Sequence, residues 1–320
     1  MARTLSDGKE VGAARTPKEQ ARIVADFIAP FKVKPGSKVR LPRDFSPSNR
    51  GSFLKKADGE ALLAVGVQLL SEYQEKLAAQ NQYGLLVVLQ AMDAAGKDGT
   101  IRHVMSGVNP QGVKVTSFKA PSAEELDHDY LWRAAKALPA RGEIGIFNRS
   151  YYEEVLIARV HPQILERQHL PKEARGPDVW KLRYRQMNDW ERYLVENGFR
   201  VVKIFLNVSH DEQRKRLLRR IDDPSRNWKF EPADLEERRF WDDYQKAYSE
   251  MLSATSTEIA PWYVVPADAK WFARMSAAAI IVDALLKIDP HFPEARPEVL
   301  QKLPEYRAAL TREMGTDSST

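Results

Sequence analysis

One stretch, residues 84–100, constrains the fold of this chain more than any other. It opens with an apolar run, Leu85–Leu89, typical of a strand buried on both faces of a parallel sheet. The run leads into Ala91-Met-Asp-Ala-Ala-Gly-Lys97, and a helix is predicted to begin at about Lys97. This is the spacing of a phosphate-binding loop, with Ala91 in place of the usual first glycine. The unpaired N–H groups that open the helix and the Lys97 ammonium group are therefore predicted to hold phosphate oxygens.

Two acidic side chains in this stretch point to a metal ion. Asp93 would repel a bound phosphate, and a bridging Mg²⁺ would remove that conflict. Asp98 stands where a serine or threonine usually coordinates magnesium, so part of that role is expected to have moved to Asp93. The alternative is a tight strand-to-helix turn that binds nothing. The order of strand, loop, lysine and helix favours the phosphate loop.

Composition excludes several classes of function. The 320 residues include no cysteine, which excludes disulfides, thiolate zinc sites and a cysteine nucleophile. The chain has 49 Lys and Arg against 44 Asp and Glu, and the net charge of +5 is compatible with a polyanionic partner. The segment Met1–Gln20 has no apolar signal core, and no apolar stretch is long enough to span a bilayer. We therefore expect a cytoplasmic protein with no membrane partner.

Strands and helices alternate along the chain, which predicts one α/β domain with a parallel sheet and right-handed crossovers. After the first strand, further strands are predicted over residues 113–118, 143–148, 200–208 and 262–265. The main helices are predicted over residues 61–80, 122–138, 178–197, 235–252 and 270–285. Residues 1–80 should form an N-terminal tail, a basic arm and a helix, residues 81–290 the main domain with a lid at about 209–234, and residues 291–320 a C-terminal extension.

A second polar cluster follows the strand predicted over residues 143–148. Phosphate-loop enzymes usually have an Asp at the end of such a strand, on the magnesium side of the site. This chain has Asn148, which can hold a metal-bound water but adds no charge. The next residue, Arg149, can grip a transferring phosphoryl group with two N–H groups. The alternative is a strand end and a helix cap, with Glu153 in a structural role.

A third cluster is the basic segment over residues 210–229. It follows the predicted strand that ends at Val208, where nucleotide kinases carry a closing lid. The spacing of Arg216, Arg219 and Arg220 places them on one helix face. These residues and Lys229 are predicted to line a channel that leads to the phosphate loop. The alternative is a solvated charged face.

Together these motifs resemble the polyphosphate kinase 2 family. The resemblance rests on four segments: Ala-Met-Asp-Ala-Ala-Gly-Lys-Asp-Gly-Thr at 91–100, Gly-Glu-Ile-Gly-Ile-Phe-Asn-Arg-Ser-Tyr at 142–151, Asp-Pro-Ser-Arg-Asn-Trp-Lys at 223–229, and Ala-Pro-Trp-Tyr-Val-Val-Pro-Ala-Asp-Ala-Lys-Trp at 260–271. The likeness runs from about Phe31 to Ile288. Segments 109–112, 117–122 and 127–133 resemble the subgroup that phosphorylates both AMP and ADP.

The resemblance implies a three-layer α/β/α P-loop kinase fold, with a central parallel sheet and a helical lid, related to thymidylate kinase. It implies a cytoplasmic phosphotransferase that reversibly moves a phosphoryl group from inorganic polyphosphate to AMP and ADP. Mg²⁺ is the implied cofactor, with Mn²⁺ as a substitute, and the family usually forms homo-oligomers, so a dimer or tetramer is expected. The expected partners are polyphosphate and adenine nucleotides, with guanine nucleotides left open and no nucleic acid.

By position, the resemblance places the catalytic centre at Asp93, Lys97, Asn148 and Arg149, with Asp93 as a magnesium ligand and Asn148 acting through a water. The residues expected to contact the nucleotide are Asn109, Glu125, Arg133 and Arg149, and the alternative role of Glu125 is to cap its own helix. Those expected to contact polyphosphate are Gly96, Lys97, Asp98, Gly99, Thr100, Arg216, Arg219, Arg220 and Lys229. Asn148 departs from the family, because many members have Asp there, and this bears on metal binding rather than on the reaction.

Two other functions fit parts of the sequence. An ATP-dependent nucleoside monophosphate kinase would share the fold, but the long basic arm and lid favour a polyanion longer than ATP. A nucleic-acid-binding module would use the same basic stretches. No aromatic stacking pattern accompanies those stretches, however, and Asp93 would serve no purpose in such a module.

Overall fold

The computed structural model describes residues 4–5, 9–10, 16–52 and 55–316. Its main feature is an all-parallel sheet of five strands in the order β4-β5-β3-β6-β7. These strands are β3 (Gly84–Ala91), β4 (Val113–Ser117), β5 (Ile144–Asn148), β6 (Phe199–Asn207) and β7 (Trp262–Pro266). Every residue of β3 is buried, as expected for the central strand of a sheet that is covered on both faces.

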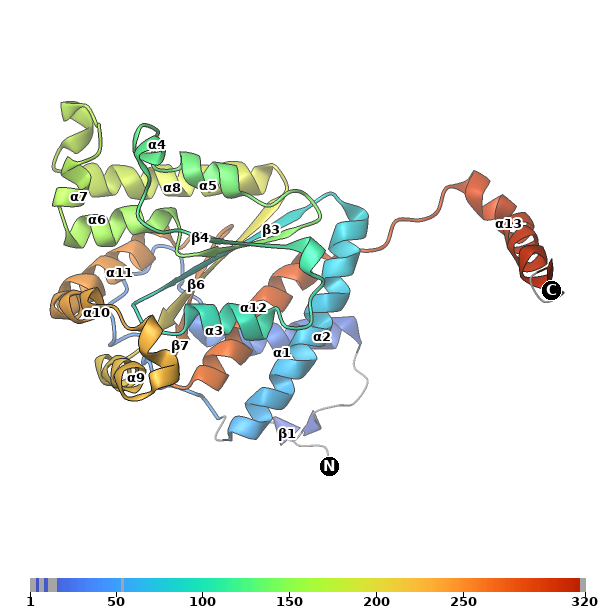
Figure 1. Cartoon of the computed structure of the whole chain (residues 1–320), viewed down its shortest axis with the longest axis horizontal. Helices are drawn as coiled ribbons and strands as arrows, with labels where there is room; N and C mark the ends of the chain where they lie inside the picture. The colour runs from blue at the N-terminus through green and yellow to red at the C-terminus, as the bar shows by residue number, and fades with distance from the viewer. Residues whose placement is uncertain (1–3, 6–8, 11–15, 53–54, 317–320) are drawn as a thin grey trace.

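Helices cover both faces of this sheet, so the molecule has three layers (Figure 1). One face carries α1 (Pro17–Ile28), α2 (Lys56–Gln80), α3 (Lys97–Val104) and α12 (Lys270–Ile288). The other carries α6 (Ile157–Val160), α8 (Val179–Glu196) and α11 (Trp241–Thr255). The predicted three-layer α/β/α architecture with a central parallel sheet is therefore confirmed.

The helix α12 is the centre of its layer. Residues on most of its circumference are buried, because α1 and α2 cover the side that faces away from the sheet. Gly59 of α2 permits this close packing. A Cβ atom at Gly59 would lie only 2.1 Å from Cε3 of Trp271, so the indole ring occupies the space that any larger residue would need.

The predicted basic arm, which begins at Lys32, runs along the β7 side of the sheet. The Val33 amide donates to the Trp262 carbonyl at 2.9 Å, and Val33 and Val39 are buried in the main core. Farther along, the Asn207 side chain donates to the Phe45 carbonyl at 2.8 Å, so this part of the arm lies beside the carboxyl end of β6. Near the N-terminus, β1 (Thr4–Leu5) and β2 (Lys9–Glu10) form a separate antiparallel pair.

Two of the predicted helices are interrupted. The helix predicted over residues 122–138 is two helices, α4 (Ala123–Leu126) and α5 (Trp132–Ala137), because Asp129 accepts a bond from the Leu131 amide at 2.9 Å and forms a turn. The helix predicted over residues 235–252 begins as α10 (Pro232–Glu237) and passes through a 3₁₀ turn before α11. At that turn the Arg238 guanidinium group donates to Gln213 Oε1 and the His210 carbonyl.

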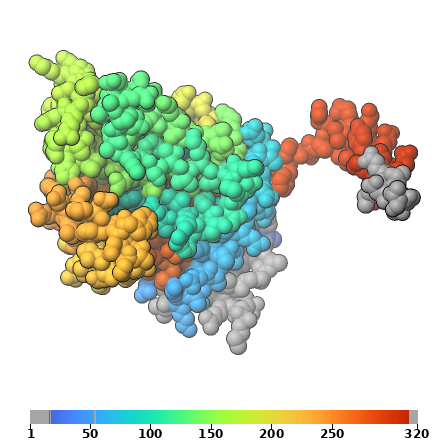
Figure 2. All heavy atoms as spheres, in the orientation of Figure 1, coloured from blue at the N-terminus to red at the C-terminus, as the bar shows by residue number. Residues whose placement is uncertain are grey.

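Three helices and six 3₁₀ turns complete the described structure, and of these only α9 and α13 are long. They are the helices α7 (Gln163–Glu166), α9 (His210–Asp222) and α13 (Pro297–Thr316), and the 3₁₀ turns η1 (Ala29–Phe31), η2 (Pro110–Gly112), η3 (Tyr151–Val155), η4 (Lys172–Arg175), η5 (Pro224–Lys229) and η6 (Arg238–Phe240). Figures 1 and 2 show that α13 stands apart from the body of the molecule. Among the described helices, none is both long and apolar enough to cross a membrane.

Candidate active site

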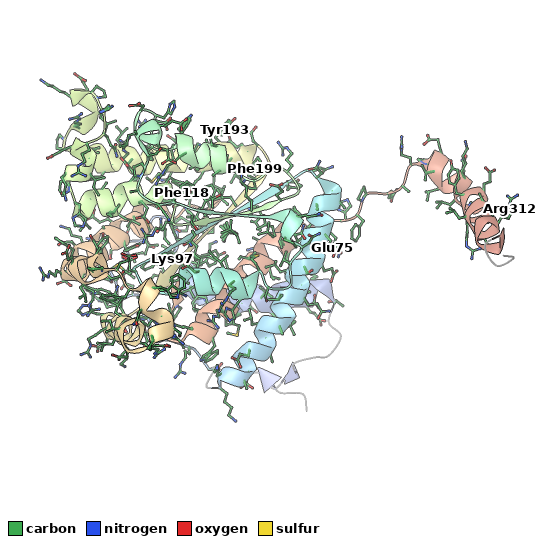
Figure 3. The ribbon with its side chains drawn as sticks, viewed as in Figure 1. Glu75, Lys97, Phe118, Tyr193, Phe199 and Arg312 are labelled. Carbon is green, nitrogen blue, oxygen red and sulfur yellow. The ribbon has the colours of Figure 1, made fainter. Side chains whose placement is uncertain are left out.

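The carboxyl ends of the parallel strands gather the polar side chains at one edge of the sheet. The register pairs Leu89 of β3 with Asn148 of β5, and Asn148 in turn with Ser117 of β4, so β4 and β5 end at the same level and β3 continues past it to Ala91. Lys97 lies at this edge in Figure 3, whereas Phe199, which begins β6, lies toward the opposite one. Open parallel sheets bind their ligands at the carboxyl edge.

The loop from Ala91 to Gly96 has the backbone of an anion cradle. Ala94 and Gly96 both have positive φ, at 58° and 109°, so the chain reverses sharply before α3 begins at Lys97. The carbonyls of residues 93, 94 and 95 all accept hydrogen bonds from side chains of α9. The Ala95 amide donates to the Met92 carbonyl at 3.3 Å. Because the carbonyls of residues 93–95 are turned toward α9, we expect the other loop amides to face the opposite side, where a phosphate can bind.

The α9 donors to the loop carbonyls are Gln213 and Arg216. Gln213 Nε2 donates to the Asp93 carbonyl at 3.0 Å, and Arg216 Nη1 to the Ala94 and Ala95 carbonyls at 3.1 and 2.6 Å. Arg216 also binds Glu212 and two carbonyls beyond β7, so its guanidinium group has a protein acceptor at all three nitrogens. The prediction that Arg216 contacts polyphosphate is therefore corrected, because this side chain is buried and supports the loop from behind.

The Lys97 side chain folds back over the loop. Its Nζ donates to the Ala91 carbonyl at 2.8 Å and lies 3.4 Å from the Met92 carbonyl. Burial lowers the pKa of Lys97, and the neighbouring Asp93 opposes that shift. The ammonium group is therefore partly desolvated before any ligand binds, and an anion at the loop would strengthen its charged form.

Asp93 and Arg149 form the ion pair at the centre of the site. Arg149 Nη2 donates to Asp93 Oδ1 at 2.8 Å, and both side chains are partly exposed. Burial alone would lower the pKa of Arg149, but the nearby carboxylates of Glu153 and Asp93 outweigh it and raise the pKa. Burial raises the pKa of Glu153, whereas Arg149 and Lys97 lower it, so Glu153 belongs to this charge cluster.

The predicted magnesium-side residues also meet at this edge. Asn148 Nδ2 donates to Asp98 Oδ1 at 2.6 Å, which brings the end of β5 to the start of α3. The described residues contain no cluster of three His, Cys, Asp or Glu side chains that could hold a metal alone. Mg²⁺ usually keeps several waters and takes one or two carboxylates together with substrate phosphates, so Asp93 with Asn148 suits that ion.

The start of α3 supplies two different environments. Asp98 is exposed and faces Asn148, whereas Thr100 is 5% exposed and lines an apolar pocket under the helix. The Thr100 amide donates to the Gly96 carbonyl at 2.9 Å. The predicted phosphate contact at Thr100 is therefore corrected, because its amide is bonded within the helix and its side chain is buried. The amides of Lys97, Asp98 and Gly99 open the helix ahead of it.

The predicted nucleotide contacts are divided between the two edges of the sheet. Arg133 lies over the Phe118 ring, 5.2 Å from its centroid, and pairs with Glu125 at 3.2 Å. The Phe118 amide donates to the Asn148 carbonyl at 3.0 Å, so this group is at the carboxyl edge. Glu125 also completes the cap of α4, accepting from the Ser122 amide at 2.9 Å.

Asn109 lies elsewhere. With Gly142 and Glu143 it lines a pocket that precedes β4 and β5, at the amino edge of the sheet. The length of β5, roughly 15 Å for its five residues, separates this pocket from Asn148. The prediction that Asn109 contacts the nucleotide at the phosphate loop is therefore corrected. Its side chain caps η2, accepting from the Gln111 amide at 3.0 Å.

The lid, residues 209–234, contains both paired and unpaired cations. Arg220 binds Asp234 at 2.8 Å and the Lys229 carbonyl at 3.0 Å, so it joins α9 to the later part of the lid. Arg214 pairs with Asp211 on the exposed face of α9. Within the described residues, the exposed Arg219 and Lys229 have no carboxylate partner.

Three cations near the loop were not predicted from the sequence. They are Arg102 of α3 and Lys270 and Arg274 of α12. Burial and the neighbouring Arg216 and Arg219 lower the pKa of Lys270 to about 8. Burial and Arg102 lower the pKa of Arg274. Positive charge thus continues from the lid to the start of α12, and only the tertiary fold brings these residues together.

Comparisons with known proteins agree with this site. Residues 53–293 match the family model described as polyphosphate kinase 2. The chain is 50% identical to the ADP-polyphosphate phosphotransferase of Rhodopseudomonas palustris over 284 residues, covering 88% of this chain and 98% of that one. It is 46% identical to the AMP/ADP-polyphosphate phosphotransferase of Meiothermus ruber over 266 residues, covering 82% and 95%.

A solved structure gives the same result at the level of the fold. The crystal structure of polyphosphate kinase 2 from Arthrobacter aurescens TC1 matches with a TM-score of 0.80 and 41% identity, over 94% of this chain and 99% of that one. The family match covers more than half of the chain, and the relatives are matched over nearly their whole length. The protein therefore belongs to the polyphosphate kinase 2 family.

Proposed function

We propose that the protein reversibly transfers the terminal phosphoryl group of inorganic polyphosphate to AMP and to ADP, giving ADP and ATP. The observation that carries this proposal is the series of cations that runs from Lys97 past Arg219 to Lys270, in a family whose named relatives use polyphosphate with AMP or ADP. Such a series suits a linear polyanion. An ATP-dependent nucleoside monophosphate kinase would need no cations beyond those that hold a triphosphate.

In this reaction the acceptor phosphate oxygen is already a competent nucleophile, so no general base is required. Catalysis then rests on positioning and on neutralising charge as the phosphoryl group transfers. The loop amides and Lys97 bind the donor phosphates from one side. Arg149, held by Asp93, clamps the transferring group between donor and acceptor. Arg133 lies over Phe118 at the same edge and suits the acceptor phosphate.

Mg²⁺ is the cofactor that this donor set fits. Asp93 and, through a water, Asn148 would hold it together with phosphate oxygens. When bound, the ion would neutralise charge on the phosphates. Mn²⁺ has the same preference for oxygen ligands and is proposed as a substitute.

The donor and the acceptors can be tested in one assay. The purified protein is incubated with Mg²⁺, with polyphosphate or ATP as sole donor, and with AMP, ADP, GMP or GDP as acceptor. We expect AMP with excess polyphosphate to yield ADP first and ATP later, and the guanine acceptors will define base preference. Phosphorylation of AMP by ATP alone would favour the monophosphate kinase, and a product that stalls at ADP would contradict the dual acceptor.

Removing one lid cation should weaken polyphosphate binding selectively. Arg219→Ala is expected to raise the KM for polyphosphate about tenfold, because it removes an exposed, unpaired charge that can bond to phosphate. The slope of log KM against log salt should fall by about 1. The matched control is Arg214→Ala on the same helix, whose charge is already paired with Asp211. Equal effects in both variants would show that only net charge matters.

The binding of polyphosphate should also depend on pH through Lys270. Its pKa of about 8 means that the charged form is present below pH 8 and lost above it. Since a polyanion binds the charged form, the KM for polyphosphate is expected to rise about tenfold between pH 7 and pH 9.5. Lys270→Arg keeps its charge over this range and should remove the rise. An unchanged profile in Lys270→Arg would assign the titration to another group.

We also propose a homo-oligomer, dimer or tetramer, in the cytoplasm. The support for self-association is α13, which stands apart from the body and leaves Leu300, Leu303, Tyr306 and Leu310 about half exposed. Exposed apolar side chains in a row on one helix are typical of an association surface. Light scattering of the full chain tests the proposal, and a monomeric mass at micromolar concentration would contradict it.

A further inference from the structure

Arg149 has a backbone conformation that needs support. Its φ is +62°, in the left-handed region of the backbone that residues other than glycine rarely adopt. Such a conformation persists where the surrounding structure over-determines it, and it is typical of functional sites. On the side of β3, the Arg149 amide donates to the Leu89 carbonyl at 3.0 Å. The following residues must supply the rest of the support.

Those residues are buried and hydrogen-bonded. Ser150 Oγ accepts from the Tyr152 amide and from Gln90 Nε2, both at 3.1 Å. The Tyr151 and Tyr152 hydroxyl groups both donate to the same oxygen, Oε1 of Glu191 on α8, at 2.7 Å each. The two rings are 2% and 0% exposed, so the chain immediately after Arg149 is tied to α8 by one carboxylate.

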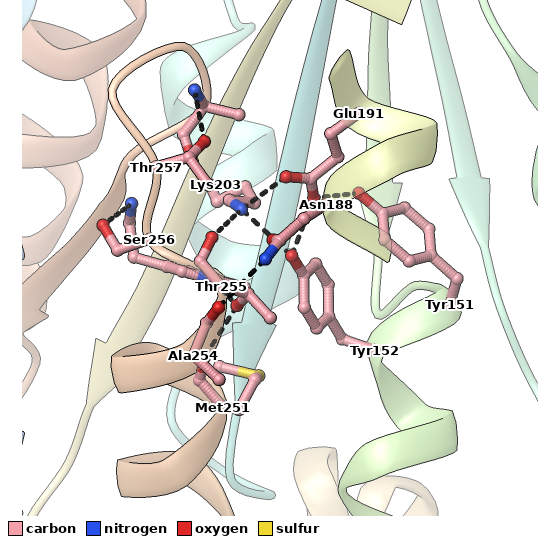
Figure 4. A network of polar contacts seen from close by, with 12 residues as sticks. Tyr151, Tyr152, Asn188, Glu191, Lys203, Met251, Ala254, Thr255, Ser256 and Thr257 are labelled. Atoms are coloured by element: carbon pink, nitrogen blue, oxygen red, sulfur yellow. Dashed lines mark hydrogen bonds and ion pairs between the residues drawn. The ribbon is translucent and has the colours of Figure 1, made fainter. Parts of the chain in front are cut away.

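Glu191 is itself fixed by a buried lysine. Lys203 Nζ of β6 lies 2.6 Å from Glu191 Oε2, and both side chains are 0% exposed. Its other two donors go to the Thr255 carbonyl at 2.6 Å and to the Tyr152 hydroxyl at 3.0 Å. Figure 4 shows this arrangement, with Lys203 between the helix that carries Glu191 and the end of α11 at Thr255. All three ammonium donors are satisfied, which makes the group rigid.

We propose that Glu191 and Lys203, acting through Tyr151 and Tyr152, are positioning residues that hold Arg149 in its left-handed conformation and so aim its guanidinium group. The inference rests on the role proposed above for Arg149. Among the described contacts, no hydrogen bond or ion pair joins these four side chains to residues 91–97. The Tyr151 and Tyr152 rings pack in the apolar core, but the Glu191–Lys203 pair is not needed there, because a pair of aliphatic residues would fill its space as well. What the four side chains have in common is that they fix the position of the segment that begins at Arg149.

The first test removes the hydroxyl groups that tie this segment to Glu191. Tyr151→Phe and the double variant Tyr151→Phe/Tyr152→Phe keep the rings, and kcat is expected to fall, in the double variant by about tenfold to a hundredfold. The KM for polyphosphate should stay within about twofold, because donor binding rests on the loop and lid. The matched control is Ser256→Ala, which also removes one buried hydroxyl group, bonded to the Val33 carbonyl at 2.8 Å. It should destabilise the fold without lowering kcat.

The second test asks whether the effect passes through Arg149. The tyrosine substitutions are repeated in an Arg149→Ala background, well below the melting temperature of each variant. If the network positions Arg149, removing the hydroxyl groups should cause no further loss of kcat there, although stability still falls. Losses that multiply in both backgrounds would overturn the proposal and leave the network a purely structural one. If the double variant does not fold, the cycle with Tyr151→Phe alone decides.

The cycle is run with whichever donor the wild-type protein uses. Failure of the proposed function would appear as a wild-type protein that does not use polyphosphate, and the positioning test would then continue with ATP. Failure of the positioning inference appears only in the tyrosine variants.

Discussion

Lys97→Ala is expected to lower kcat for phosphoryl transfer from polyphosphate to ADP by about 10²–10³-fold or more, with the fold intact. A charge that is held in place before the reaction stabilises the transition state strongly, and its removal typically has an effect of this size. Lys97 is held in that way, since its ammonium group lies within reach of two loop carbonyls. The measurement is kcat at saturating substrates, with circular dichroism to establish folding.

Two further variants define the cause of that loss. Lys97→Met keeps the length and packing of the side chain but not the charge, so it should lose as much activity as Lys97→Ala. Lys181→Ala removes an exposed lysine of α8 that is paired with Asp178, and it should leave kcat unchanged. Near-normal turnover by a folded Lys97→Met protein would mean that residues 91–97 do not act as a phosphate loop.

Asp93→Ala is expected to cause a loss of similar size, about 10²–10³-fold in kcat, for two reasons that can be separated. It releases Arg149, which Asp93 holds at 2.8 Å, and it removes the only carboxylate that we propose as a ligand of Mg²⁺. Asp93→Asn keeps an oxygen that can accept from Arg149 but is a weaker metal ligand. We therefore expect Asp93→Asn to need more Mg²⁺ for half-maximal activity.

The Mg²⁺ titration decides between the two reasons. If Asp93→Asn has near-normal kcat and an unchanged Mg²⁺ requirement, Asp93 acts only by holding Arg149, and the metal is bound elsewhere. If activity in Asp93→Asn recovers at high Mg²⁺ while Asp93→Ala stays inactive, both roles are present.

The sequence predicted the fold well because its signals were local. The run Leu85–Leu89 is buried on all sides as expected, and the lysine that follows the loop opens a helix. The ends of the strands then followed from topology alone, since parallel strands place Asn148 and Ser117 at one level. Helix ends were less predictable. At Asp129 a side chain bonds to the backbone and interrupts the helix predicted over residues 122–138.

The site was only partly predictable because sequence shows which charges exist but not which are paired. Arg216 and Arg219 are three residues apart on α9, yet Arg216 is 4% exposed and bonded to carbonyls, whereas Arg219 is exposed. Lys270 could not be predicted from local signals, because it lies far from Lys97 along the sequence. Asn109 directly precedes the strand predicted over residues 113–118, so topology alone already placed it at the amino edge, in conflict with the role that the resemblance implied.

The contacts from α9 to the phosphate loop also limit how the lid can move. Gln213 and Arg216 fasten the first half of α9 to the carbonyls of residues 93–95, whereas Arg219 and Lys229 lie beyond that anchor. We therefore expect slow hydrogen exchange for the amides before Leu217 and faster exchange for those after it. A lid with a fixed base and a mobile tip can let a long polyanion advance by one phosphate after each turnover. The phosphate-binding loop, residues 91–96, would keep its shape while the next phosphate enters it.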